Sequence, residues 1–380
     1  KNSIVVFIAL VMVFGFTATA MAEVTLHGSA RFFTYSVDSD KEWTGTAYDD
    51  TDTLWAMGAL SRFGAKFSAG DVGGMWEMDA RNSGTYPWGS GGYNGLVSDT
   101  SGLGSLRMRH LYGTWNFGGG QLLIGQTWPV ANVFTTNLNY TTNGLQFWGG
   151  VGALSARTTQ IRLTFGDFMV GLLTPYTTGG GVTGYATDYD VTLPKVELRY
   201  DLKMQMANIA FIAGYQTYEA VNATDVSKDI DAYTLAIAPQ FNFGPAYLNL
   251  CLSYNQNPGN YGLSPASSLT YDSAYLSGTE VEDMKGYGAE VALGYKVSDM
   301  VTLEAGYSKA SYDGNVAGGD REDESQSYYA QVKLTMAPGV FIVPEFAVFD
   351  KEDKKAGGGA AATEDGKQTV FGIWWCINFK

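Results

Sequence analysis

The segment Val370-Phe371-Gly372-Ile373-Trp374-Trp375-Cys376-Ile377-Asn378-Phe379, close to the carboxy terminus, decides the fold of this chain. Side chains along a β-strand point alternately to its two faces, so one face of this segment collects five large apolar residues. The other face, with Gly372, Trp374, Cys376 and Asn378, matches neither a soluble core nor a solvated surface. The pattern predicts a strand with lipid on one side and a polar lumen on the other. The apolar face consists of Phe371, Ile373, Trp375, Ile377 and Phe379.

A segment of this length is too short to cross a bilayer as a helix. A tilted strand of about ten residues does cross it, provided that each backbone N–H and C=O bonds to a neighbouring strand. The last strand must then pair with the first. The predicted fold class is therefore all-β, a closed antiparallel transmembrane β-barrel.

The amino-terminal residues have the pattern of a secretory signal peptide. An apolar run over residues 4–16 follows Lys1, and Ala20-Met21-Ala22 matches the small-residue cleavage pattern. The run stops short of the roughly 18 residues that a membrane-anchoring helix requires. We expect residues 1–22 to be a signal peptide and residues 23–380 to form the barrel.

Composition favours strands and argues against several function classes. The chain has 48 glycines, 24 tyrosines and 20 phenylalanines but only 10 prolines. Its two cysteines, Cys251 and Cys376, exclude a disulfide scaffold, and we expect two free thiols because they lie on strands far apart. The net charge of −14 argues against nucleic-acid binding.

Sixteen segments show the alternation of a β-strand bounded by turn residues. Tight turns such as Ala337-Pro338-Gly339 alternate with long links such as 257–283. An even strand number, short periplasmic turns and long external loops are the layout of outer-membrane barrels. Three acidic clusters, within 38–52, 313–324 and 350–365, are expected between strands. The predicted strands are 23–37, 53–70, 73–82, 105–117, 120–128, 157–166, 167–175, 193–202, 205–218, 229–243, 245–256, 284–297, 299–311, 325–337, 339–350 and 367–379.

Aromatic residues on the expected apolar faces recur eight residues apart in four strands. At about 3.3 Å per residue and a tilt of about 40°, this interval spans roughly 20 Å, close to the apolar band of such barrels. We expect two aromatic girdles; a soluble sandwich with aromatic strand ends is the alternative. The pairs are Trp55 with Phe63, Tyr233 with Phe241, Tyr287 with Tyr295, and Phe371 with Phe379.

Several segments resemble the general diffusion porins of bacterial outer membranes. Ser61-Arg62-Phe63-Gly64-Ala65-Lys66-Phe67 is similar to a Ser-Arg-apolar-Gly-apolar-Lys-Gly element of that family. Residues 107–125 resemble the fourth and fifth strands of the family, and 157–163 the arginine-bearing start of the sixth. The alternating final strand resembles the signal recognised by the barrel-assembly machinery, although Lys380 follows Phe379 here.

This resemblance implies a homotrimer of sixteen-stranded barrels in the outer-membrane lipid, with a third external loop folded into the lumen. The matching segment is 129–156, whose Phe134, Phe147 and Trp148 are too apolar for the alternative, an exposed surface loop. The family places acidic residues in this loop, but 129–156 contains no Asp or Glu. We expect neutral groups at the constriction: Asn132, Asn137, Asn139, Tyr140 and Asn143.

Basic residues are expected on the opposing wall. An arginine on the lipid face near mid-membrane would cost about 2–4 kcal/mol, so alternation places these side chains in the lumen. Glu77 and Asp79 share this face and would pair with some of them. Like charges in a narrow passage determine which ions enter, and we expect this role for the basic residues. The alternative is that they only stabilise the barrel wall. The basic wall consists of Arg31, Arg62, Lys66, Arg81, Arg107, Arg109 and Arg162.

One predicted strand, 105–117, has a face that suits lipid poorly. Strict alternation turns His110, Thr114 and Asn116 outward. Either this face lies in a subunit interface, since the resemblance places the first strands at the trimer centre, or a β-bulge shifts the alternation.

The sequence offers little for catalysis or metal binding. The only histidines are His27 and His110, and a hydrolase would need one of them beside a serine and an orienting acid. Two histidines and two separated cysteines give no transition-metal site, and the acidic runs lack a calcium-loop pattern. We expect no enzyme activity, no cofactor and no metal.

Together these patterns predict an outer-membrane porin of a Gram-negative bacterium. Small hydrophilic solutes and ions would diffuse through it, with a weak preference for anions at the constriction. The alternatives are a substrate-specific channel for sugars or oxyanions, and a plugged barrel with a structural or adhesive role.

Overall fold

The computed structural model describes residues 23–45, 47–57, 61–81, 105–141, 144–147, 157–177, 188–222, 224, 226–263, 271–277, 280–316, 319–352, 354–357, 361–363 and 365–380. The expected signal peptide, residues 1–22, lies outside this set, as do Asn143 and Trp148. Arg81 ends a described strand, but its side chain and that of Phe147 also lie outside.

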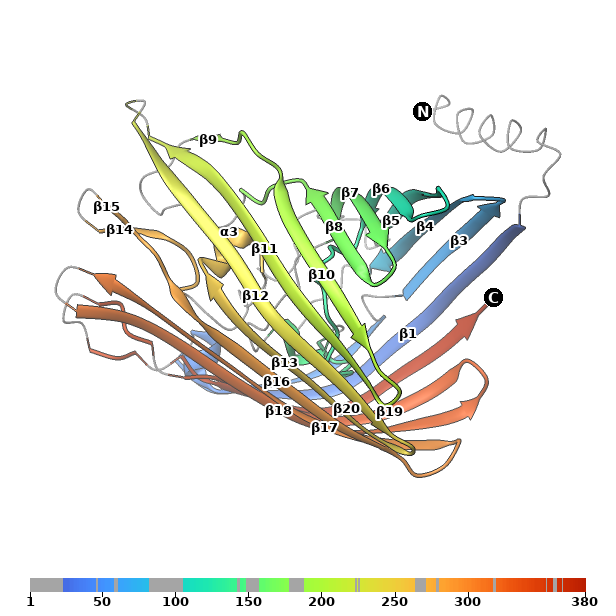
Figure 1. Ribbon diagram of the computed structural model, residues 1–380. Coiled ribbons are helices and arrows are strands. Elements are labelled where there is room, and N and C mark those ends of the chain that lie inside the picture. Colours follow the sequence, from blue (N-terminus) through green and yellow to red (C-terminus); the bar gives the residue numbers. More distant parts are fainter. Residues whose placement is uncertain are drawn as a thin grey trace.

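A single antiparallel sheet closes on itself to form a barrel (Figure 1). Strand β1 (Glu23–Ser39) pairs with the final strand β20 (Lys367–Phe379), from Gly28 opposite Phe379 to Ser39 opposite Gln368. Closure gives both strands a hydrogen-bonded neighbour on each side, which the hydrocarbon layer requires. The predicted pairing of the last strand with the first is confirmed.

The described part of the barrel contains 18 strand segments, and two pairs of them are pieces of one strand. β2 (Asp50–Met57) and β3 (Ser61–Ala69) pair with successive parts of β1, and β9 (Asp188–Asp190) and β10 (Lys195–Lys203) with successive parts of β11. The barrel therefore has 16 strands, as predicted. The others are β4 (Val72–Arg81), β5 (Ser105–Asn116), β6 (Gln121–Thr127), β7 (Thr158–Phe165), β8 (Phe168–Leu173), β11 (Ala207–Val221), β12 (Ser227–Phe243), β13 (Ala246–Gln256), β16 (Lys285–Lys296), β17 (Val301–Val316), β18 (Gly319–Ala337) and β19 (Val340–Lys351).

Short elements lie in the links between these strands. They are α2 (Lys41–Thr44), the 3-10 turn η1 (Gly144–Phe147), α3 (Pro258–Tyr261) and a hairpin of β14 (Tyr275–Ser277) with β15 (Glu280–Glu282). Among the described residues, no helix has the length and apolar character needed to span a bilayer.

The two faces of the strands differ as the alternation predicts. In β20, Phe371 is 63% exposed on the outer surface, whereas Trp374 and Cys376 are buried inside. The aromatic pair Tyr287 and Tyr295 on β16 is likewise exposed on the outside. Both cysteines are buried free thiols, as expected.

One long link is largely a continuation of the sheet. β17 and β18 remain paired up to Val316 opposite Gly319, with Asp313 opposite Glu322. The expectation that this acidic cluster lies between strands is therefore wrong. Apolar alternation marks only the part of a strand that faces lipid, and backbone pairing continues beyond it with polar side chains. The acidic residues on these two strands are Asp313, Asp320, Glu322, Asp323 and Glu324.

A β-bulge interrupts the alternation of β5. Glu77 of β4 pairs with His110, but the next residue, Met78, pairs with Met108, so Arg109 is an extra residue on β5. Compared with strict alternation, an extra residue moves every position that follows it to the opposite face of the sheet.

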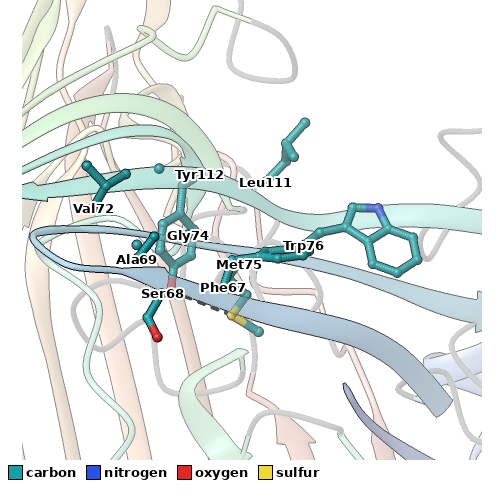
Figure 2. Close-up of a pocket in the computed structure, with 11 residues that line it drawn as sticks. Phe67, Ser68, Ala69, Val72, Gly74, Met75, Trp76, Leu111 and Tyr112 are labelled. Carbon is teal, nitrogen blue, oxygen red and sulfur yellow. Dashed lines mark hydrogen bonds between the residues drawn. The ribbon is translucent and has the colours of Figure 1, made fainter. Parts of the chain in front are cut away.

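The bulge brings the polar face of β5 into the barrel. Tyr112 turns towards Met75, to which its hydroxyl donates at 3.6 Å, while Leu111 points the other way and is 54% exposed (Figure 2). Of the two explanations for the polar residues of β5, the bulge is confirmed. The subunit-interface explanation is wrong, because His110 and Thr114 lie on the inner face.

Candidate functional site

The link that follows β6 folds into the barrel and runs along its inner wall. Ala131 and Val133 share a buried cluster with Ile212 of β11. Further along the link, Leu138 and Tyr140 pack with inward-facing aromatic residues of β1, β19 and β20. We call the described residues 128–141 and 144–147 the inner loop.

Four buried glutamates on the inner wall hold the inner loop. Glu197 lies on β10, Glu290 on β16, Glu304 on β17 and Glu345 on β19. Each accepts at least one hydrogen bond from the loop. Because burying a carboxylate is costly unless it accepts hydrogen bonds, loop and glutamates stabilise each other.

The first two glutamates bind the early part of the inner loop. The backbone N–H of Ala131 donates to Oε2 of Glu197 at 2.8 Å. The hydroxyl of Thr136 donates to Oε1 of Glu290 at 2.6 Å. These contacts fix the loop to β10 and β16.

The other two glutamates bind two asparagines in the same way. Asn137 donates its backbone N–H at 3.0 Å and its side-chain amide at 2.6 Å to Glu304. Asn139 donates the same two groups to Glu345 at 2.8 and 2.6 Å. Tyr35 of β1 also donates to Glu345, at 2.6 Å. In an extended backbone, residues two apart point to the same side, so the spacing of the asparagines suits this double attachment.

The loop residues chosen from sequence therefore bind the wall. We expected them to offer hydrogen bonds to the passage, but the amides of Asn137 and Asn139 point to glutamates and Tyr140 is buried. Asn132 is buried too, and its backbone carbonyl accepts from Arg199 at 2.9 Å.

The glutamates themselves were missed by sequence reasoning. A signal was present in β16, where Glu290 occupies an inward position between Gly288 and Ala292. A lone acid among small inward residues has room for a partner that comes from elsewhere in the chain.

A second external segment enters the barrel beside the inner loop. All four residues of α3 are buried. The hydroxyl of Tyr261 donates to Oε1 of Glu197 at 2.9 Å, and the ammonium of Lys195 donates to the carbonyl of Tyr261 at 3.1 Å. The same ammonium lies 4.1 Å from the centre of the Tyr261 ring. No sequence pattern indicates this contact.

The wall across from the inner loop, on β3 to β5, carries the predicted acids in ion pairs. Arg107 binds Asp79 through Nε at 3.3 Å and Nη2 at 2.6 Å. Arg109 binds Glu77 at 2.6 Å and Asp79 at 3.2 Å. Both acids are buried, so this network is rigid.

Two further arginines are less well neutralised. Arg31 donates through Nε to Ser29 at 3.2 Å and lies 5.4 Å from the Trp374 ring centre, with no ion pair to any acid in the described residues. Arg62 lies 3.6 Å from Glu77, which Arg109 already binds more closely. Three arginines thus share two carboxylates while Arg31 has none, and these residues together carry a net positive charge.

The remaining predicted residues lie elsewhere. Lys66 and Arg162 face the interior near the tight turns and line a hollow there. His27 is hydrogen-bonded to Glu77 at 3.1 Å, and His110 to Thr127 at 2.9 Å, so both histidines serve as hydrogen-bonded wall residues.

A closed barrel with a loop held inside against one wall and arginines on the other is the geometry of a channel. A family model described as Gram-negative porin matches residues 8–355. The chain belongs to the Gram-negative porin family. It is thus an outer-membrane channel, and the family and fold are those of channel proteins rather than enzymes.

Solved structures with the same fold include several porins. The outer-membrane channel DcaP of Acinetobacter baumannii has a TM-score of 0.70 at 17% identity, covering 96% of this chain and 99% of that one. An anion-selective porin from Comamonas acidovorans has 0.58 at 14%, covering 94% and 100%. OmpT of Vibrio cholerae in its trimer form has 0.56 at 14%, covering 94% and 99%. The comparison with curated proteins gave no significant match.

Proposed function

We propose that this porin allows passive diffusion of small hydrophilic solutes and ions, with a weak preference for anions. The constriction lies between the inner loop and the basic wall. One observation carries the preference: the four arginines Arg31, Arg62, Arg107 and Arg109 face only two carboxylates, and Arg31 pairs with neither. The glutamates of the opposite wall are instead covered by the inner loop.

The expected preference is weak because the passage is wet. The interaction energy between a unit charge and an ion about 4 Å away is about 1 kcal/mol in bulk water. It is about four times as large at the effective dielectric constant of a protein surface. Salt reduces this attraction, since the screening length is about 8 Å at physiological ionic strength. The preference for anions should therefore decrease as salt concentration rises.

Reversal potentials in planar bilayers test this proposal. With a KCl gradient across the bilayer, we expect the sign that corresponds to chloride preference. Arg31→Gln and Arg62→Gln should each move the potential towards zero. Lys203→Gln is the matched control, because Lys203 is exposed and paired with Asp167. A potassium-preferring native protein would contradict the proposal.

A substrate-specific oxyanion channel is the second candidate. It is favoured by Arg31, whose guanidinium faces Trp374 and has no acidic partner in the described residues. Conductance that saturates as the concentration of an oxyanion rises would support it over free diffusion. A plugged barrel would give no stepwise conductance.

We also propose a homotrimer in outer-membrane lipid, assembled through recognition of the final strand by the barrel-assembly machinery. The trimer form of the structurally similar OmpT supports the homotrimer. The apolar face of β20 supports recognition by the barrel-assembly machinery. Light scattering of the detergent-solubilised protein tests the trimer, and a monomeric mass would contradict it.

A further inference from the structure

A polar hollow lies inside the barrel away from the constriction, at the end that carries the tight turns. Its volume is about 450 Å³. Residues from six strands line it, and none of them belongs to the inner loop. Those that matter here are Lys66, Ser68, Gly73, Tyr112, Thr114 and Arg162.

Strand register places the main groups of the hollow in one row. Arg162 of β7 is opposite Leu123 of β6, which is opposite Thr114 of β5. Thr114 is in turn opposite Gly73 of β4. Tyr112 lies one inward position further from the turn on β5. The guanidinium therefore shares one stretch of inner wall with two hydroxyl groups.

The bulge at Arg109 creates this polar surface. If β5 alternated strictly through Arg109 with no bulge, Tyr112 and Thr114 would face lipid and Leu111 would face the lumen. Figure 2 shows Tyr112 on the same side of the sheet as Ser68. Gly73 leaves the necessary room, because a Cβ there would lie 2.8 Å from Oγ1 of Thr114.

The two cations of the hollow have no acidic partner among the residues that the structure describes. Nε of Arg162 is buried and has no hydrogen-bond acceptor among the described residues. Neither Arg162 nor Lys66 forms an ion pair with any acid in the described ranges, and Glu23 is the one acid that lines the hollow. A buried donor without an acceptor costs about 1–3 kcal/mol, which a bound acceptor would recover.

We propose that this hollow is a second anion site, which binds the oxygens of a carboxylate or phosphate after the anion has passed the constriction. This proposal rests on the proposed function in one respect, because the anion reaches the hollow through the channel. Nε and an Nη of Arg162 donate to two oxygens of the ligand, the geometry that guanidinium groups favour. The hydroxyl of Thr114 donates to the ligand, and so does that of Tyr112 once it gives up its long hydrogen bond to the sulfur of Met75. Lys66 attracts the anion without fixing its orientation.

The test measures the chloride current of single channels while sodium phosphate or sodium acetate is added to one side. In the native protein, the oxyanion should reduce the current, and the reduction should saturate as its concentration rises. A lower concentration should suffice when the oxyanion is added on the side of the tight turns than when it is added on the opposite side. Arg162→Gln should raise the half-saturating concentration about tenfold, and Thr114→Val about threefold. Arg31→Gln should alter ion selectivity and leave this concentration unchanged, as should Lys203→Gln.

The outcomes separate the site from the channel. If native and Arg162→Gln channels conduct, prefer anions and have equal half-saturating concentrations, the site is wrong and the proposed function stands. If the native protein prefers cations, the proposed function fails instead. Calorimetric titration of the detergent-solubilised trimer or monomer with phosphate gives a readout independent of current, and loss of binding heat in Arg162→Gln supports the site. Should Arg162→Gln not fold, Tyr112→Phe combined with Thr114→Val takes its place, with the same weakening expected.

Discussion

The hydroxyl of Tyr261 donates a 2.9 Å hydrogen bond to Glu197, and the other oxygen of that carboxylate accepts from Ala131 of the inner loop at 2.8 Å. One buried side chain of β10 therefore holds two segments that enter the barrel from different places in the sequence. Lys195 lies 3.6 Å from the same carboxylate, which keeps its charge compensated. The width of the passage should depend on this junction.

Removing the Tyr261 hydroxyl should loosen α3 while the inner loop stays attached. We expect Tyr261→Phe to raise single-channel conductance and its noise, and to lower stability by about 1.5–3 kcal/mol, the range for a hydrogen bond to a charged group. The control is Tyr287→Phe, whose side chain is exposed on the outer surface. Equal conductance in native and Tyr261→Phe channels would show that α3 does not border the passage.

Glu345 should be the strongest attachment of the inner loop. It accepts from Tyr35, from both donors of Asn139 and from the backbone N–H of Tyr140. In Glu345→Gln, the amide oxygen can still accept two of these bonds, but the amide nitrogen faces two donors from which it cannot accept, so the loop should detach from β19. We expect larger conductance and weaker anion preference, measured in bilayers. Glu282→Gln, at the external hairpin, is the control, and a smaller conductance in Glu345→Gln would contradict the assignment.

The bulge in β5 can be tested by the accessibility of single cysteines. With the native cysteines buried, Thr114→Cys should react with a water-soluble, membrane-impermeant maleimide that enters the lumen. Trp115→Cys should not react, because this position faces lipid. The reverse pattern would mean that β5 alternates strictly. Deletion of Arg109 should remove the bulge and leave Thr114 on the inner face, because His110 would then follow Met108 in regular alternation.

Alternation predicted the barrel strands because lipid imposes it on every residue that crosses the membrane. It failed where that constraint ends or is locally reversed. β17 and β18 continue past the apolar band, and one extra residue, Arg109, exchanges the faces of β5. Alternation also predicts that Glu290 points inward, but it does not identify the hydrogen-bond partner of this side chain. Its partner Thr136 lies 154 residues away, a contact that only the folded loop creates.

A pH dependence should come from Asp272, in the external link that follows α3. Its backbone carbonyl accepts from Gly259 of α3 at 2.8 Å, and its carboxylate accepts from Ser273 at 2.8 Å. Although the residue as a whole is partly exposed, burial around the carboxyl group raises its pKa to about 6. The folded link thus binds the proton more tightly than the unfolded chain does. The resulting stabilisation is complete below the ordinary carboxyl pKa of about 4 and is lost as the pH rises through 6.

Ionisation of Asp272 above pH 6 should therefore weaken the contact between this link and α3. We expect hydrogen exchange of residues 257–263 to be slower at pH 5 than at pH 7 after correction for the intrinsic effect of pH on exchange. Asp272→Asn, which stays neutral, should keep the slow exchange at both values. The exposed Asp299, in a tight turn, provides the control variant Asp299→Asn, which should behave as the native protein does. Faster corrected exchange at pH 5 than at pH 7 in the native protein would mean that ionisation of Asp272 stabilises the link. That result would contradict the raised pKa of its buried carboxyl group.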